Sequence, residues 1–138
     1  MRLSPPPLLG SRSKTNGSTP EGQVDFRLAR RAVLSELRKG RLGRADVCDA
    51  HPELLRAARN IGEATSELCP VCEEHDLALV SYVFGPGLPP SGQTVASGEE
   101  LRRLSRRADR TCYVVEVCPE CGWNHLARTF RVGRAGSV

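Results

Sequence analysis

Two Cys-x-x-Cys motifs constrain the fold of this chain more than any other feature. Residues 69–72 are Cys-Pro-Val-Cys, residues 118–121 are Cys-Pro-Glu-Cys, and the 45 residues 73–117 separate them. Each motif offers two sulfurs from one tight turn, and two such turns supply the four ligands of a tetrahedral zinc ion. A chain of 138 residues buries a limited core, so a metal cross-link would stabilise it. We therefore predict one structural zinc ion bound by Cys69, Cys72, Cys118 and Cys121.

The sequence leaves other uses of these cysteines open. Two disulfides would consume the same thiols, but there is no secretion signal and no apolar run that could cross a membrane, which favours a reducing cytoplasm. A thioredoxin-like redox pair lacks its strand-then-helix context, whereas a rubredoxin-like iron site would use the same four sulfurs. His75 or His125 would be an alternative ligand in place of one thiolate. Cys48 and Cys112 are expected to be small buried apolar residues.

The N-terminal half is predicted to be helical. Residues 1–22 are rich in Pro, Ser and Gly, which predicts a disordered tail. Apolar residues recur at helical spacing in residues 25–39, and two shorter helices are predicted at 44–49 and 52–61. We expect residues 23–62 to form a three-helix unit that resembles a helix-turn-helix core.

Strands are predicted in the C-terminal half. Residues 77–84, 111–117 and 125–132 have the length and the β-branched and aromatic content of strands. A Ser-x-x-Glu capping box at Ser97 predicts a helix over about 97–109, between the first two strands. The expected fold is α+β: the helical unit packs on a three-stranded antiparallel zinc ribbon at residues 63–132, which carries the inserted helix. Residues 133–138 are expected to be a flexible tail.

Charge is unevenly distributed along the chain. The formal net charge is +4, yet residues 62–100 hold seven acidic residues and no Lys or Arg. Of the 20 basic residues, 18 are arginine. Arginine favours bidentate contacts with phosphate or carboxylate, although a genome rich in G and C would produce the same bias. Basic segments on both sides of an acidic one can orient a partner.

Arginines gather in groups that are candidate contact surfaces. The first group lies on the first predicted helix and the second on the inserted helix, and either group could hold phosphates or simply be a solvated helix face. Two more arginines would face the partner if the third helix is a recognition helix. Trp123 either packs over the metal site or presents a stacking platform for a base. The contact candidates are Arg27, Arg31, Arg38, Arg56, Arg59, Arg103, Arg106, Arg107 and Trp123.

Several runs of the sequence resemble an uncharacterised family of small actinobacterial proteins. The resemblance covers roughly residues 24–132, and it implies a metal-binding ribbon in a domain of unknown function. A weaker likeness, at the level of architecture, is to archaeal transcription initiation factors that join a winged helix to a zinc ribbon. The runs that carry the family resemblance are residues 25–31, 44–50, 81–85, 117–121 and 123–126.

These features predict a binding protein and not an enzyme. The sequence contains no convincing Ser/His/Asp arrangement, no Gly-rich phosphate loop and no His-Glu-x-x-His motif, and four thiolates would close the zinc site to substrate. We expect a cytoplasmic adaptor that contacts nucleic acid or transcription or translation machinery such as RNA polymerase or the ribosome, with no membrane and no small-molecule substrate. The alternatives are a protein-interaction module without nucleic-acid contact and a thiol redox sensor.

Overall fold

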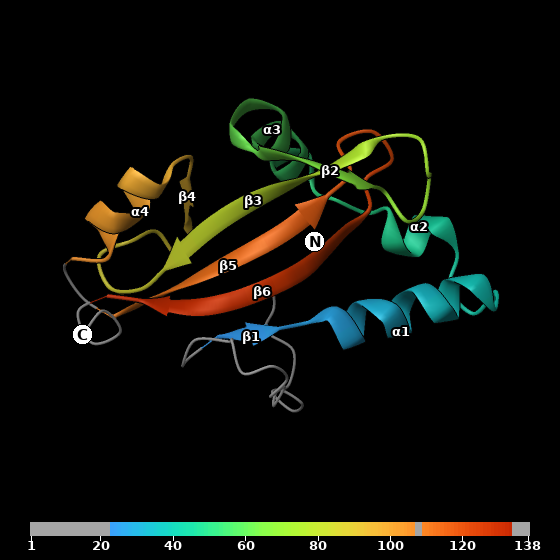
Figure 1. Cartoon of the computed structure of the whole chain (residues 1–138), viewed down its shortest axis with the longest axis horizontal. Coiled ribbons are helices and arrows are strands. Elements are labelled where there is room, and N and C mark those ends of the chain that lie inside the picture. The colour runs from blue at the N-terminus through green and yellow to red at the C-terminus, as the bar shows by residue number, and fades with distance from the viewer. Residues whose placement is uncertain (1–22, 107–108, 134–138) are drawn as a thin grey trace.

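In the part of the chain that the structure describes, six antiparallel strands form one sheet, and four short helices accompany it (Figure 1). The computed structural model describes residues 23–106 and 109–133, so the tails predicted at 1–22 and at 134–138 lie outside the described residues. The strand order is β1-β6-β5-β3-β2, and β4 also pairs with β3. The elements are β1 (Val24–Asp25), α1 (Arg27–Arg38), α2 (Arg44–Val47), α3 (Pro52–Ile61), β2 (Glu63–Leu68), β3 (Asp76–Phe84), β4 (Gln93–Val95), α4 (Gly98–Leu104), β5 (Arg110–Val117) and β6 (Asn124–Val132).

Three long strands make the centre of the sheet, and these are the strands that the sequence predicts. β5 pairs with β3 on one side and with β6 on the other, with one irregularity in the β5–β6 register between Val114 and Val115. Consecutive residues of a strand point to opposite faces, so the near-continuous apolar composition of β3 and β5 buries both faces of the sheet. Val80 and Val115 belong to the core on one face, and Val83 and Cys112 to another.

The predicted three-helix unit is wrong. α3 buries Leu54 and Ala58 in the core that Val80 forms on β3, whereas α1 buries Leu34 in a separate core with Trp123. The apolar faces of these helices are therefore covered by the sheet and by the cysteine turns. Helical periodicity reports that a helix has an apolar face, but it does not report which element covers that face. Without that unit, the likeness to winged-helix transcription factors also fails.

The predicted three-stranded ribbon is wrong as well, because the sheet has six strands within residues 23–106 and 109–133. β1 and β4 are two and three residues long, which is too short for a periodic pattern. β2 is an edge strand whose side chains are mostly exposed, and its pairing with β3 shifts register between Ala64 and Leu68. Such segments become strands because a neighbour offers hydrogen bonds, so composition alone does not identify them. The N-terminal segment belongs to the sheet through β1.

The predicted helices are present: α3 has the predicted bounds, and the other three are shorter than predicted. The Ser97 Oγ accepts a hydrogen bond from the Glu100 amide at 3.1 Å, and the Glu100 carboxylate accepts one from the Ala96 amide at 3.0 Å, which caps α4 much as predicted. α4 ends at Leu104 instead of near residue 109. Among the described residues, no helix is long and apolar enough to cross a membrane.

Candidate metal centre

The four predicted ligands come together between two hairpin turns. One Sγ atom from each of Cys69, Cys72, Cys118 and Cys121 lies within 4.8 Å of the other three. The Sγ atoms of Cys69 and Cys121 are 3.7 Å apart, and those of Cys72 and Cys118 are 3.8 Å apart. Zinc–sulfur bonds of about 2.3 Å in a tetrahedron place the sulfurs about 3.8 Å apart. The donor set and its spacing therefore fit a tetrahedral thiolate metal site.

The two turns that carry the cysteines have the same backbone construction. In the turn after β2, the Glu73 amide donates to the Cys69 carbonyl at 3.0 Å; in the turn after β5, the Gly122 amide donates to the Cys118 carbonyl, also at 3.0 Å. These two residues, each directly after the second cysteine of its motif, both have positive φ, 56° at Glu73 and 91° at Gly122. Glycine adopts positive φ without strain, and Glu73 shows that the first turn takes up the same conformation without a glycine.

Backbone amides also point at the sulfurs. The Val71 amide donates to the Cys69 Sγ and the Cys121 amide donates to the Cys118 Sγ, both at 3.4 Å. Amide hydrogen bonds to sulfur stabilise the thiolate, which is the form that binds a metal. The turns therefore prepare the ligands for metal before it binds.

Burial and hydrogen bonding act in opposite directions on the cysteine thiols. Burial raises the pKa of Cys69 and of Cys121 above the ordinary value. Burial also acts to raise the pKa of Cys72, but hydrogen bonds from His75 and from the Glu74 backbone outweigh it and lower this pKa to about 6. The same contact raises the pKa of His75. The metal-free site thus contains both protonated and deprotonated sulfurs at neutral pH.

Metal binding is expected to release protons and to weaken as the pH falls. The raised pKa values of Cys69 and Cys121 mean that these two thiols are protonated at pH 7 and must lose their protons to bind the ion. We expect metal affinity to increase with pH from 6 to 8, with at least about two protons released per ion at pH 7. Calorimetric titration in buffers of different ionisation enthalpy measures this number. Release of no protons at pH 7 would contradict the prediction.

Neither histidine belongs to the cysteine group. The His75 Nδ1 is 3.8 Å from the Cys72 Sγ, which places the ring beside a ligand. His125 is buried, and its Nδ1 is 2.8 Å from the Leu126 carbonyl oxygen. Its ring stacks on Trp123 with a centroid distance of 5.9 Å. The structure therefore favours four thiolates over the alternative of three cysteines and one histidine.

Trp123 lies in the core beside the metal centre and not on the surface. Its side chain is fully buried, so its prediction as a stacking platform is wrong and the packing alternative holds. The indole Nε1 donates to Glu116 Oε2 at 2.7 Å, and the Arg30 Nε donates to the same oxygen at 2.7 Å. This network joins α1 to β5 and to the second cysteine turn. No sequence pattern marks Glu116 as its centre.

Cys48 is the residue that sequence reasoning missed. It is half-buried, and its Sγ lies 3.6 Å from the Sγ of Cys121. It follows α2, and the Ala50 amide donates to the Gly122 carbonyl at 3.1 Å, which brings this segment to the second cysteine turn. Cys112, in contrast, is buried in the sheet as predicted, and burial raises its pKa to about 11.

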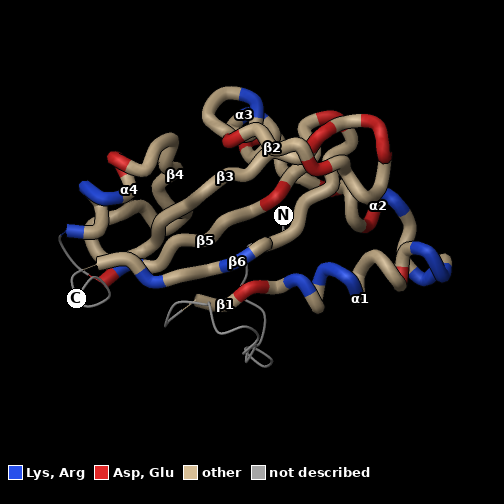
Figure 2. The backbone as a smooth tube through the Cα atoms, viewed as in Figure 1, with Lys and Arg blue, Asp and Glu red and all other residues tan. Residues whose placement is uncertain are grey.

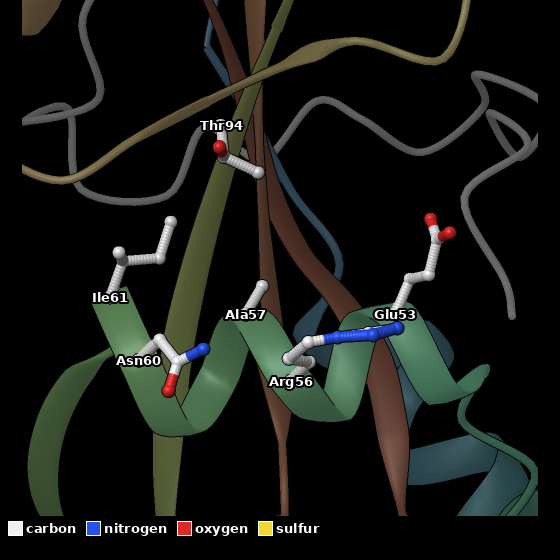
Figure 3. A pocket seen from close by; sticks show the side chains of 6 residues that line it. All are labelled: Glu53, Arg56, Ala57, Asn60, Ile61 and Thr94. Carbon is white, nitrogen blue, oxygen red and sulfur yellow. The ribbon is translucent and has the colours of Figure 1, made fainter.

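The predicted arginine contacts fall into three situations. On α1, Arg27, Arg31 and Arg38 are exposed, and so are Arg103 and Arg106 at α4, while Arg107 lies outside the described residues. Arg59 donates to the Pro119 carbonyl at 2.7 Å and so connects α3 to the second cysteine turn. Arg56 lines an open depression between α3 and β4, together with Glu53, Ala57, Asn60, Ile61 and Thr94 (Figure 3).

Fold and site together define an antiparallel-sheet protein in which a four-cysteine cluster, able to hold a metal ion, joins two hairpin turns. The chain belongs to a family of unknown function, DUF5318, which matches residues 18–138. Uncharacterized proteins of Mycobacterium tuberculosis and Mycobacterium bovis are each 42% identical to it over 113 residues, which cover 81% of this chain and 82% of each relative. No solved structure matches the chain. The resemblance to an actinobacterial family of unknown function is thereby confirmed.

Proposed function

We propose that this chain is a non-enzymatic, zinc-stabilised adaptor that contacts nucleic acid through the exposed arginine face of α1. One observation supports the proposal above the others: the metal centre and its core cover one side of α1, while arginines occupy the other. The zinc ion has a structural role in this proposal, because four thiolates fill its coordination shell. Zinc is proposed over iron because zinc binds four thiolates in a tetrahedron and has no redox chemistry, which suits a structural role.

Three contacts hold α1 in place. Ahead of the helix, the Phe26 amide donates to the Ala127 carbonyl at 3.0 Å. In its first turns, Arg30 forms the ion pair with Glu116, whose side chain is only 10% exposed. Further along, Leu34 is buried in the core that also contains Cys69 and Cys118. A helix held in this way presents its outer residues in a constant orientation, which reduces the entropic cost of binding.

The outer face of α1 carries positive charge. Figure 2 shows basic residues along α1, whereas acidic residues gather on β2 and the turn after it. Arg27 is partly neutralised by Asp25 at 3.5 Å, but Arg31 and Arg38 have no carboxylate in ion-pairing distance among the described residues. Exposed arginines on a rigid helix suit phosphate groups, and the acidic region on the remaining surface would orient the nucleic acid toward α1.

Charge reversal on α1 tests the proposal. We expect Arg31→Glu with Arg38→Glu to weaken binding of a fluorescent single-stranded RNA or duplex DNA at least about tenfold and to reduce the salt slope by about two. Fluorescence anisotropy over a salt series measures both quantities. The matched control is Arg103→Glu with Arg106→Glu, which makes the same charge change at α4.

The control distinguishes binding through the arginine face of α1 from a general effect of the protein's net charge. Equal loss of binding in both double variants would contradict the assignment to α1. No binding of either nucleic acid by the wild type would overturn the nucleic-acid proposal, and a protein retained from nuclease-treated cytoplasm would then favour the interaction module. Metal analysis of the purified protein tests the other part, with about one zinc per chain expected.

A further inference from the structure

We infer that Cys48 and Cys121 form an oxidative modification site, at which a hydroperoxide joins the two sulfurs in a disulfide and removes Cys121 from the metal. This inference rests on the metal centre and is independent of any contact with nucleic acid. The reaction uses a thiol that the metal does not need, because the four ligands are complete without Cys48.

Distance distinguishes Cys48 from the remaining cysteine outside the ligand group. The 3.6 Å between the Sγ atoms of Cys48 and Cys121 is as short as the separations within the ligand group. Formation of a disulfide of about 2.05 Å needs the sulfurs to approach by roughly 1.5 Å, which side-chain rotation accommodates. Cys112 lies in the sheet opposite Phe130 and Val83, in a separate core.

The backbone keeps the two cysteines together. The Ala50 amide donates to the Gly122 carbonyl, and the Asn124 side chain donates to Asp49 at 2.9 Å, so the segment after Cys48 is joined to the segment after Cys121. A Cβ atom placed on Gly122 would lie only 3.0 Å from the Cys48 carbonyl oxygen, which shows how closely the two backbones approach. The contact between the sulfurs is therefore a consequence of the fold.

Access and local charge favour reaction at this pair. Cys48, Cys72 and Cys121 are half-buried, whereas Cys69 and Cys118 are fully buried, and of the half-buried three Cys48 is the one outside the ligand group. Cys48 and Cys121 raise the pKa of the exposed Arg44 guanidinium, and a cation beside sulfur favours nucleophilic attack by that sulfur. A small hydroperoxide thus reaches these sulfurs before the buried ligands.

The chemistry balances with one hydrogen peroxide. The Cys48 sulfur attacks the peroxide, the O–O bond breaks, and a sulfenic acid and one water form. The Cys121 sulfur then displaces hydroxide from the sulfenic sulfur, and the hydroxide takes up a proton to become a second water. Two thiols are oxidised to one disulfide while the peroxide is reduced to two waters. The metal loses one of its four ligands, which weakens the centre that supports α1.

Peptide mapping and zinc release test this assignment on the full chain. Limiting hydrogen peroxide is expected to produce a Cys48–Cys121 disulfide, with zinc released to a chromogenic chelator in parallel and the disulfide reversed by dithiothreitol. In Cys48→Ala, zinc release should slow at least about tenfold, because the first step has lost its thiol. Cys112→Ala is the matched control and should release zinc as the wild type does.

Two outcomes overturn the inference. One is a disulfide that joins only ligand cysteines in the wild type; the other is zinc release from Cys48→Ala at the wild-type rate. Cys48→Ser provides a second variant if alanine disturbs α2, and the wild-type peptide map needs no variant. These measurements do not involve nucleic acid. Their outcome therefore does not depend on whether α1 contacts nucleic acid.

Discussion

Cys118→Ser is expected to remove most of the folding stability of this protein, and a strong chelator is expected to do the same to the wild type. Cys118 is fully buried in the core that holds Leu34, Leu77 and Trp123. A serine hydroxyl is a poor ligand for zinc, and the metal's binding energy is folding energy in small domains. Because a domain has only about 5–15 kcal/mol of stability, loss of the ion would consume most of it.

Circular dichroism with thermal unfolding measures this effect. Glu120→Ser is the matched control, since it places serine at an exposed position in the same turn without removing a ligand. We expect the control to unfold within about 0.5 kcal/mol of the wild type. A Cys118→Ser variant as stable as the control, together with a wild type indifferent to chelator, would show that the fold does not need the metal.

Glu116→Ala is expected to destabilise the protein by about 2–4 kcal/mol, because two buried donors lose their acceptor. The Glu116 side chain is 10% exposed and accepts from both Arg30 and Trp123 at 2.7 Å. Without it, the guanidinium and the indole N–H are left unpaired. Of the two donors, only the Trp123 indole is fully buried; Arg30 is 27% exposed, so solvent reduces the penalty below that of a fully buried pair.

A comparison of two ion pairs checks the role of burial. Urea unfolding of Glu116→Ala should be set against Glu36→Ala, which removes the exposed partner of Arg41 at 3.2 Å. The exposed pair should cost about 0–0.5 kcal/mol. The double variant Arg30→Met, Glu116→Gln should recover part of the loss, because glutamine accepts from the indole and methionine needs no acceptor. Similar losses in the two alanine variants would contradict the role assigned to the network.

Local patterns account for the elements that are predicted correctly. β3, β5 and β6 are long and rich in apolar residues. Pro52 and Ser97 mark the N-terminal ends of α3 and α4. These signals lie within a few residues of the structure that they specify. The four cysteines that could hold a metal ion follow from two local motifs, because each motif needs only its own turn.

Tertiary packing decides where the helices lie. α1 and α3 have clear apolar faces, but the faces pack on different cores and not on each other. The short strands β1 and β4 and the exposed edge strand β2 exist because a neighbouring strand pairs with them. Neither property is local, so a helical unit on a three-stranded ribbon is a natural but incorrect interpretation of the sequence.

The candidate site divides in the same way. The sequence by itself determined which four cysteines could hold a metal ion, since each turn carries two of them within four consecutive residues. Only the tertiary structure decided that the buried Trp123 donates a hydrogen bond to Glu116 and that Arg59 donates one to the Pro119 carbonyl. It also decided that the sulfurs of Cys48 and Cys121, which are 73 residues apart in the sequence, are in contact. The physical reason is range: turn geometry depends on adjacent residues, whereas burial and sulfur–sulfur contact depend on segments that meet only when the sheet closes.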